Sequence, residues 1–522
     1  MRFFAKFAKK VISKTDETIR QKTMHLMCAA GATANREHVK LPTWPSYFAH
    51  RYRDTAVFRF SLSRLLTTLS LFTALTVAAQ ARRPNIIYVM LDDAGYGDFG
   101  AFGSPHVKTP TFDRLCREGM KFTNHYSGSC VCAPTRCVLM TGLHTGHARR
   151  RDNTAQALIK ELSATNGRAL VFLENEDVTV AEALKAAGYV TGGIGKWGLG
   201  NPGFDGVPEN QGFDYWYGYL DQVHAHDHFP PEIWDGGKMV KIPENENGNQ
   251  GVYIPYRQEE KTLEFIRENK DKEFFLYLAV TPPHGKYIIP TDDPAFAQYD
   301  HLADAGNDKS KKTIQHYAAM ITRTDQTIGK MMQLLKSLDL DEDTIVFYTS
   351  DNGPNNQFIK PLNSAAGLRG TKRDLFEGGI RAAMAVRWPG HVPAGKTSDF
   401  IWDMRDFFPT ACELANAEAP DHLDGMSVVP TLMGKSQQGR QMHYWEFYSP
   451  FQQSVRMGPW KGIRFGTEEP IMLFNLDQDR SETTDIAAQH PEIVAQMESH
   501  MTASHAESKY FPVQRYASKK QR

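Results

Sequence analysis

Asn85-Ile86-Ile87-Tyr88-Val89-Met90-Leu91-Asp92-Asp93 is an apolar run that ends in two adjacent carboxylates. A short, continuous apolar run predicts a strand buried on both faces, as found in parallel sheets. Residues that follow such a strand lie at its carboxyl end, and in open α/β sheets this is the edge where ligands bind. The stretch therefore predicts an α/β fold and the place of its site.

Two later runs repeat this pattern. Phe274–Val280 is apolar and leads into Thr281-Pro282-Pro283-His284, and Thr344–Thr349 leads into Ser350-Asp351-Asn352-Gly353. Parallel strands bring their carboxyl ends to one edge, so segments far apart in the chain can form one site. We expect a large mixed or parallel sheet with helices on both faces.

The domain organisation follows from the spacing of these elements. Residues 82–433 are the predicted catalytic α/β domain, with helices over Val178–Ala187 and Thr313–Leu338. Residues 434–522 are predicted to form a smaller α+β subdomain. Its expected elements are strands at His443–Phe447 and Met472–Leu476 and a helix over Pro491–Met501.

The N-terminal residues predict export. The apolar run Leu65–Ala78 follows basic residues and precedes Ala79-Gln80-Ala81, which has the small-x-small form of a cleavage site. We assign residues 58–81 to a secretory signal peptide, which predicts a periplasmic or secreted protein, and regard residues 1–57 as a doubtful N-terminal extension. A membrane anchor is the alternative, but the run is shorter than the roughly 20 apolar residues of a span.

Composition excludes some classes of protein. The 60 basic and 60 acidic residues of the 522-residue chain cancel, so the overall positive field of a nucleic-acid-binding protein is missing. The six cysteines are too few and too unevenly spaced for a disulfide scaffold, although a bridge between Cys130 and Cys137 is conceivable. A zinc site is poorly supported because no second cysteine pair exists elsewhere.

The run Cys132-Ala133-Pro134-Thr135-Arg136 continues through apolar residues to Gly142. Proline near the start and glycine at the end predict a helix that begins at Cys132. Free backbone N–H groups and the helix dipole favour an anion at that end, so the Cys132 thiol is a candidate nucleophile. The alternative is a buried structural cysteine.

Four side chains at the predicted sheet edge offer only oxygen ligands, which favour Ca²⁺ or Mg²⁺ over Zn²⁺. They are Asp92, Asp93, Asp351 and Asn352. Each pair alone is common in turns and helix caps. Because both pairs follow apolar strands, we predict that they form one cation site.

These motifs together resemble the type I, formylglycine-dependent sulfatase family of the alkaline-phosphatase-like superfamily. The matching segments are Leu91–Asp98, Cys132–Arg136 with Thr141-Gly142, Gly188–Trp197, Ser350–Pro354, and Lys372 with Phe376–Arg381. The resemblance implies that a separate formylglycine-generating enzyme oxidises Cys132 and that the hydrated aldehyde is the nucleophile. It also implies that the modified Cys132 binds Ca²⁺, rather than Mg²⁺, together with Asp92, Asp93, Asp351 and Asn352.

The resemblance further assigns Arg136 and Lys196 to the sulfate and the formylglycine, and His284 and Lys372 to the sulfate and the leaving group. His284 would be the acid that protonates the departing oxygen. Fixed cations are suited to this task because charge develops on the sulfate ester oxygens as the S–O bond breaks.

One position departs from the family pattern. Many sulfatases carry Gly-Lys-Trp-His-Leu-Gly where this chain has Gly198 in place of the histidine. The base linked to that histidine must therefore come from elsewhere. We expect His226, in the run His224-Ala225-His226-Asp227-His228, with His144 and His147 as alternatives.

The substrate is predicted to be a sulfated saccharide, such as a fragment of an algal galactan or a glycosaminoglycan. Five aromatic residues suit either stacking on sugar rings or core packing: Tyr215, Trp216, Tyr217, Tyr219 and Trp234. Arg456 and Trp460-Lys461 are candidates for closing over the substrate. The alternatives are a phosphodiesterase or phosphonate hydrolase of the same superfamily and a non-catalytic protein that binds sulfated glycans.

Overall fold

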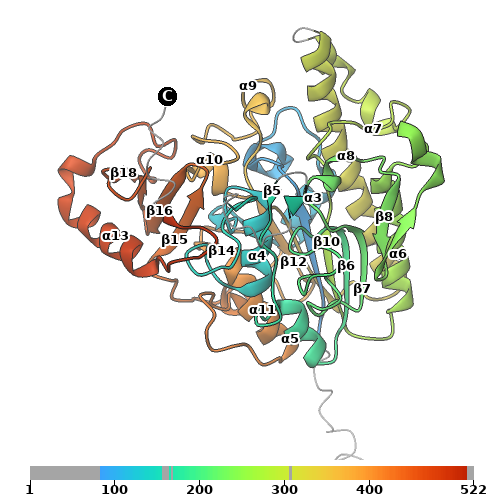
Figure 1. The fold of residues 1–522 in the computed structure, drawn as a ribbon, viewed down its shortest axis with the longest axis horizontal. Coiled ribbons are helices and arrows are strands. Elements are labelled where there is room, and N and C mark those ends of the chain that lie inside the picture. Colours follow the sequence, from blue (N-terminus) through green and yellow to red (C-terminus); the bar gives the residue numbers. More distant parts are fainter. Residues whose placement is uncertain (1–82, 156–163, 166–167, 305–307, 514–522) are drawn as a thin grey trace, which may run out of the picture. The chain divides into compact units, whose positions relative to one another are not determined.

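Ten strands form the central sheet of the computed structural model, in the order β13-β2-β12-β11-β1-β10-β6-β7-β8-β9 (Figure 1). The structure describes residues 83–155, 164–165, 168–304 and 308–513, so the predicted signal peptide lies outside the described residues. The strands are β1 (Asn85–Leu91), β2 (Met120–Phe122), β6 (Val190–Lys196), β7 (Tyr215–Tyr219), β8 (Glu232–Asp235), β9 (Lys238–Lys241), β10 (Phe274–Ala279), β11 (Thr344–Ser350), β12 (Met384–Arg387) and β13 (Lys396–Ser398).

The centre of this sheet is parallel. β1 pairs in parallel with β10 and β11, and the parallel order continues through β6 to β7. β12 joins β11 antiparallel, and β8 and β9 extend the other side antiparallel. The predicted mixed α/β sheet is therefore confirmed, and the apolar runs that begin at Asn85, Phe274 and Thr344 are its three central strands.

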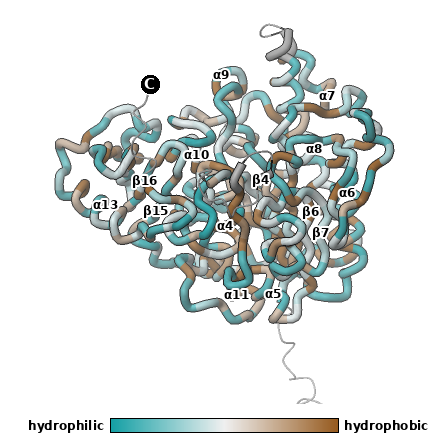
Figure 2. The backbone as a smooth tube through the Cα atoms, viewed as in Figure 1, coloured by the Kyte–Doolittle hydropathy of each residue, from teal (hydrophilic) through white to brown (hydrophobic). Residues whose placement is uncertain are grey.

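Side chains alternate along each strand, so the apolar strands present apolar side chains on both faces of the sheet. Helices cover each face. Ile87 and Val89 of β1 belong to a core cluster with residues of α6 (Ile254–Glu268) and α8 (Asp308–Ser337). Tyr88 and Met90 belong to the opposite cluster. That cluster includes residues of α4 (Cys132–Thr141), α5 (Val180–Ala186) and α11 (Phe407–Ala415). The apolar character of α4 and α11 is visible in Figure 2.

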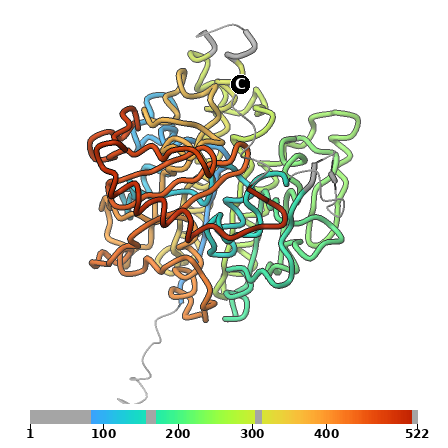
Figure 3. Tube along the Cα trace, turned by 60° about the vertical axis from the view of Figure 1, so that its left-hand side comes forward, coloured from blue at the N-terminus to red at the C-terminus, as the bar shows by residue number. Residues whose placement is uncertain are grey.

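The C-terminal part, drawn in red in Figure 3, forms a second sheet. This sheet is antiparallel, in the order β15-β16-β17-β18. Its elements are β15 (His443–Tyr448), β16 (Phe451–Met457), β17 (Trp460–Arg464), β18 (Met472–Asn475) and α13 (Pro491–Ser504). The predicted α+β character of this region is confirmed, whereas the boundary between residues 433 and 434 stays a prediction.

Short elements complete the fold. The two helices predicted for the α/β domain have bounds close to those observed. The short elements are α3 (Pro110–Glu118), β3 (His125–Tyr126), β4 (Ala164–Thr165), β5 (Arg168–Ala169), α7 (Pro294–Ala297), α9 (Ile359–Leu362), α10 (Glu377–Ile380), β14 (Trp402–Asp403) and α12 (Val429–Leu432). α5 begins where Thr179 accepts a hydrogen bond from the backbone N–H of Glu182, a capping box. The later predicted helix begins earlier than residue 313, at Asp308.

Sugar stacking and core packing were both open for five aromatic residues; four of them pack in the core, and Tyr215 is partly buried against it. Trp216 and Tyr219 are fully buried, and Tyr217 and Trp234 are nearly so. Trp216 packs edge-on against Trp197 and Phe213. Their place on β7 and β8, between covering elements, leaves them for packing rather than for a ligand.

Arg456 and Lys461 were candidates for closing over the substrate. They are instead buried in an ionic cluster and do not have this role. Lys461 Nζ lies 2.9 Å from Glu377 of α10 and 3.2 Å from Glu482. Arg456 contacts the Tyr126 hydroxyl and lies 3.7 Å from Glu377. Because buried charges require partners, this cluster links α10 to the C-terminal sheet.

We predict that Glu377→Gln lowers the free energy of unfolding by about 3–5 kcal/mol, because it leaves the cations of Arg381 and Lys461 with less compensation in a buried site. Urea denaturation followed by tryptophan fluorescence measures this change. The matched control is Glu260→Gln in the exposed pair with Arg257, which we expect to change stability by less than about 1 kcal/mol. Equal losses in both variants would contradict the structural role of the cluster.

Candidate active site

The polar residues predicted at the sheet edge converge there. The site residues lie at the carboxyl ends of four adjacent parallel strands: Asp92 and Asp93 after β1, Asp351 and Asn352 after β11, His284 after β10, and Lys196 at the end of β6. Residue 351 is drawn to β1 because its backbone N–H donates to Leu91 O at 3.0 Å. Segments distant in sequence thus form one polar cluster.

Helix α4 delivers two further residues to this cluster. Cys132 is its first residue, preceded by Val131 in an extended conformation, and is buried. Arg136, one turn later, donates from Nη2 to Asp92 Oδ2 at 3.3 Å and to Asp351 Oδ2 at 3.2 Å. Its Nη1 donates to Lys196 O at 2.5 Å. The guanidinium therefore ties α4 to β1, β11 and β6.

The other predicted cations meet the same carboxylates. Lys196 Nζ donates to Asp92 Oδ2 at 2.6 Å, and Lys372 Nζ lies 2.7 Å from Asp93. His284 Nε2 is 3.5 Å from Asp93 Oδ2. The structure thus brings together Arg136, Lys196, His284 and Lys372 around two aspartates.

The donor set fits a hard cation. Asp92 Oδ1 and Asn352 Oδ1 are buried and accept no hydrogen bond from the described residues. Ligand atoms of Asp92, Cys132 and Asp351 all lie within 4.8 Å of one another. Buried oxygens without donors carry a desolvation penalty that a bound Ca²⁺ would remove. Asp92, Asp93, Asp351 and Asn352 are therefore suited to hold a divalent cation.

Electrostatics point the same way. Burial and the charge of Asp92 raise the pKa of Asp351 to about 8, and burial also raises the pKa of Asp93. For Asp92, burial raises the pKa, but the charges of Lys196 and Arg136 oppose it and the net pKa is low. Close carboxylates resist simultaneous ionisation, and a dication between them relieves that repulsion.

His284 is held neutral in the described protein. Burial lowers its pKa well below the usual value, and Lys372 and Lys196 lower it further against the opposing charge of Asp92. An anionic group bound by Lys372 would shift this balance and favour the imidazolium form. Such a change would suit a residue that donates a proton only when its substrate is bound.

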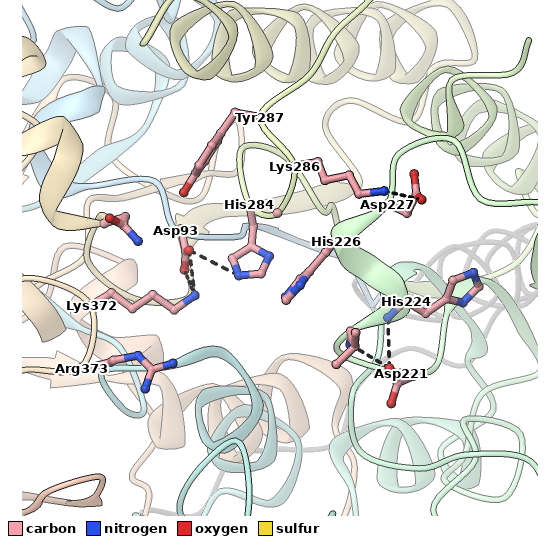
Figure 4. A pocket seen from close by; sticks show the side chains of 13 residues that line it. Asp93, Asp221, His224, His226, Asp227, His284, Lys286, Tyr287, Lys372 and Arg373 are labelled. Atoms are coloured by element: carbon pink, nitrogen blue, oxygen red, sulfur yellow. Dashed lines mark hydrogen bonds and ion pairs between the residues drawn. The ribbon is translucent and has the colours of Figure 1, made fainter. Parts of the chain in front are cut away.

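A cavity of about 820 Å³ opens onto this cluster (Figure 4). Asp93, His284 and Lys372 lie on one side of it, and His226 reaches in from the 3-10 helix η3 (His224–His226). The rings of His226 and His284 are 4.6 Å apart between centroids. His226 therefore lies within the pocket, as expected of a residue that acts there.

The alternative histidines lie elsewhere. His144 and His147 follow α4, whose ten residues span about 15 Å from Cys132 at its start. His147 Nδ1 is 2.9 Å from Asp424 Oδ2, and His144 Nε2 is 3.6 Å from the same atom. These contacts hold both histidines at the opposite end of the helix from the cysteine.

Two neighbours of Cys132 were missed from the sequence. Cys132 Sγ donates to Gln222 Oε1 at 3.0 Å and lies 3.6 Å from Asn153 Oδ1. Asn153 Oδ1 also accepts from the backbone N–H of Ala133 at 3.1 Å. In the sequence, Gly198 was the residue that could have indicated these neighbours, because its missing side chain leaves space for another residue.

The cysteines of the described residues are free, so the conceivable Cys130–Cys137 bridge is not formed.

Comparisons with known proteins agree on one family. The sulfatase family model matches residues 84–417, and a model described as N-sulphoglucosamine sulphohydrolase, C-terminal, matches residues 370–507. Human N-acetylgalactosamine-6-sulfatase is 32% identical over 394 residues, covering 70% of this chain and 68% of that protein. N-acetylgalactosamine-6-O-sulfatase of Bacteroides thetaiotaomicron is 28% identical over 527 residues, covering 84% and 98%.

Solved structures share the fold of this chain. Ps i-CgsB in complex with k-i-k-neocarrahexaose superposes with a TM-score of 0.69 and 27% identity, covering 82% of this chain and 95% of that one. The phosphonate monoester hydrolase of Agrobacterium radiobacter shares the fold, with a TM-score of 0.58 and 19% identity over 81% of this chain and 95% of that one.

We predict that the affinity of the metal-free protein for Ca²⁺ rises about tenfold per pH unit up to about pH 8 and then levels off. The reason is that Asp351, whose pKa is about 8, must lose its proton to bind the ion. Calorimetric titration with Ca²⁺ in buffers of different ionisation enthalpy measures both the affinity and the proton released. A constant affinity between about pH 6 and pH 8 would contradict this assignment, and Asp351→Asn is expected to weaken the pH dependence.

Proposed function

We propose that this chain, which belongs to the sulfatase family and is a sulfatase, hydrolyses sulfate esters of carbohydrates with a formylglycine made from Cys132 and a bound Ca²⁺. The observation that carries the proposal is the position of Cys132 at the start of α4, beside buried Asp92 and Asp351. Buried charges are costly, and a cysteine that serves only for packing would not require two aspartates and an arginine near its side chain.

The protein's own residues supply the binding charges. Lys372 and His284 line the cavity and are the groups proposed to hold the sulfate and its leaving oxygen. Lys196 and Arg136 are fully buried, and both pair with Asp92 and so compensate its charge beside Cys132. Fixed cations in a site shielded from water stabilise charge that develops on sulfate oxygens, since they need no reorganisation during the reaction.

Formylglycine in its hydrated form supplies a nucleophilic hydroxyl, and Ca²⁺ supplies the positive charge that favours its ionisation. Asp92, Asp93, Asp351 and Asn352 would hold the ion together with residue 132. His284 is proposed to donate the proton that the departing sugar oxygen takes up. His226 is proposed to remove the proton from the second hydroxyl of the hydrated residue 132. Loss of this proton lets sulfate leave and restores the aldehyde.

The proposed substrates are sulfated saccharide fragments. The relatives are named as N-acetylgalactosamine-6-sulfatases, and Ps i-CgsB was solved with a neocarrahexaose. The cavity of about 820 Å³ lies within the usual range of ligand pockets, and most of its lining side chains are polar or charged, with Tyr287 among them. Recognition is therefore expected to rest on hydrogen bonds to hydroxyls and on ion pairs.

The surroundings of the protein are also proposed. The predicted signal peptide at residues 58–81 favours the periplasm or secretion. Among the described residues, the helices are too short or too polar to cross a bilayer. Phosphonate or phosphodiester hydrolysis is a weaker candidate, because the likeness to the phosphonate hydrolase extends only to the fold.

We expect Cys132→Ala to abolish sulfate release from a panel of sulfated mono- and oligosaccharides, because the variant lacks the side chain that is converted to the nucleophile. Protein co-expressed with a formylglycine-generating enzyme is assayed by ion chromatography of free sulfate. Cys137→Ala, at a buried position on the same helix, is the matched control and should retain activity. Undiminished release by Cys132→Ala would refute the proposed nucleophile, and turnover of phosphodiesters alone would favour the other chemistry.

His226→Ala is predicted to lower kcat about a hundredfold or more, the usual contribution of a general base. Steady-state kinetics on the best saccharide of the panel measure it. The control His147→Ala removes a histidine at the far end of α4 and should leave kcat unchanged. Normal turnover by His226→Ala would show that another group accepts the proton.

A further inference from the structure

Gln222 occupies the space that a side chain at position 198 would need. Gly198 has a φ of +80°, and a Cβ added there would lie 1.7 Å from Gln222 Nε2. This distance is far below van der Waals contact, so residue 198 cannot carry a side chain while Gln222 keeps its position. The position of the Gln222 side chain therefore requires glycine at residue 198.

The backbone around this pair is firmly held. The Gly198 N–H donates to Leu220 O at 3.0 Å, which joins the segment after β6 to the segment after β7. Arg150 is buried and donates from Nη1 to Gly198 O at 2.6 Å and from Nη2 to Asn153 O at 2.6 Å. Arg150 thus fixes both Gly198 and Asn153 beside Cys132.

The Gln222 amide is aimed at the reacting side chain. Its Oε1 accepts from Cys132 Sγ at 3.0 Å, and only 8% of the residue is exposed. Its Nε2 is buried and finds no hydrogen-bond partner among the described residues. Sγ stands for the oxygen that would be attached to the same carbon after conversion. An unpaired buried amide is unfavourable unless a ligand or reacting group completes its hydrogen bonds.

We propose that Gln222 is a further catalytic residue of this chain, one that fills the space left by Gly198 and hydrogen-bonds the reacting oxygen of residue 132. The inference rests on the proposed function. A carboxamide accepts a hydrogen bond from a hydroxyl through Oε1 and donates one to a charged oxygen through Nε2, but it does not take up a proton near neutral pH. Gln222 therefore orients the nucleophile, and the removal of the proton is left to a different residue.

Gln222→Met tests this role because it keeps most of the volume and removes the amide. We expect kcat for sulfate release to fall about tenfold, the value of one hydrogen bond, and KM to change less than about twofold. KM should be spared because Asp221 and Val223 line the cavity whereas Gln222 does not. Gln258→Met, at a buried glutamine of α6, is the matched control and should leave both constants unchanged.

Gly198→Ala tests the same contact while residue 222 remains a glutamine. Its methyl group must displace the Gln222 amide, and the positive φ of residue 198 adds backbone strain, so kcat should fall at least as far as in Gln222→Met. The double variant should lose no more than Gly198→Ala alone, because the amide contact is already broken there. Losses that multiply to about a hundredfold would overturn the proposal, since the two residues would then act independently.

A second readout does not depend on turnover. The hydrogen bond to the hydroxyl favours the hydrated side chain, so an aminooxy reagent, which attacks the free aldehyde, should label residue 132 faster in Gln222→Met and in Gly198→Ala. Wild-type rates of labelling and of sulfate release in both variants would overturn the role of Gln222 and leave the proposed function standing. Failure of the wild-type protein itself to release sulfate would instead refute the proposed function, and the role of Gln222 would fall with it.

Discussion

The fold depends on burying negative charge at the edge of the central sheet. Asp92, Asp93 and Asp351 are fully buried, and such carboxylates are tolerated only with charged partners or a metal. Arg136 bridges two of them, so the start of α4 is positioned by the same ion pairs that neutralise the sheet edge. The position of Cys132 is thus a consequence of charge compensation. In this arrangement the stability of the site and its chemistry share one set of contacts.

That constraint explains how much of the site could be predicted. Continuous apolar runs ending in acidic residues identified β1 and β11, because period and composition report burial on both faces. Parallel pairing then brought Asp92 and Asp351 together, and the same logic placed His284. These predictions succeeded because each residue is adjacent in sequence to the strand that positions it.

The errors have the opposite cause. Arg456 and Lys461 face a buried partner, Glu377, from a distant segment, and no local pattern reports that ion cluster. For Trp216 on β7 the sequence left sugar stacking and core packing open, because the aromatic neighbours of Trp216 gave no sign of which face met the core. Gln222 was missed because its contact with Cys132 is made across a loop. Only the empty volume at Gly198 indicated that a side chain from elsewhere was needed.

Oxidation to formylglycine is what would make Cys132 a nucleophile, and the mass of the peptide that contains residue 132 reports this oxidation. We predict that protein which releases sulfate from a sulfated saccharide carries the aldehyde, or its hydrate, at this residue in a fraction that tracks the specific activity across preparations. Full activity in protein whose peptide retains unmodified cysteine would contradict the claim.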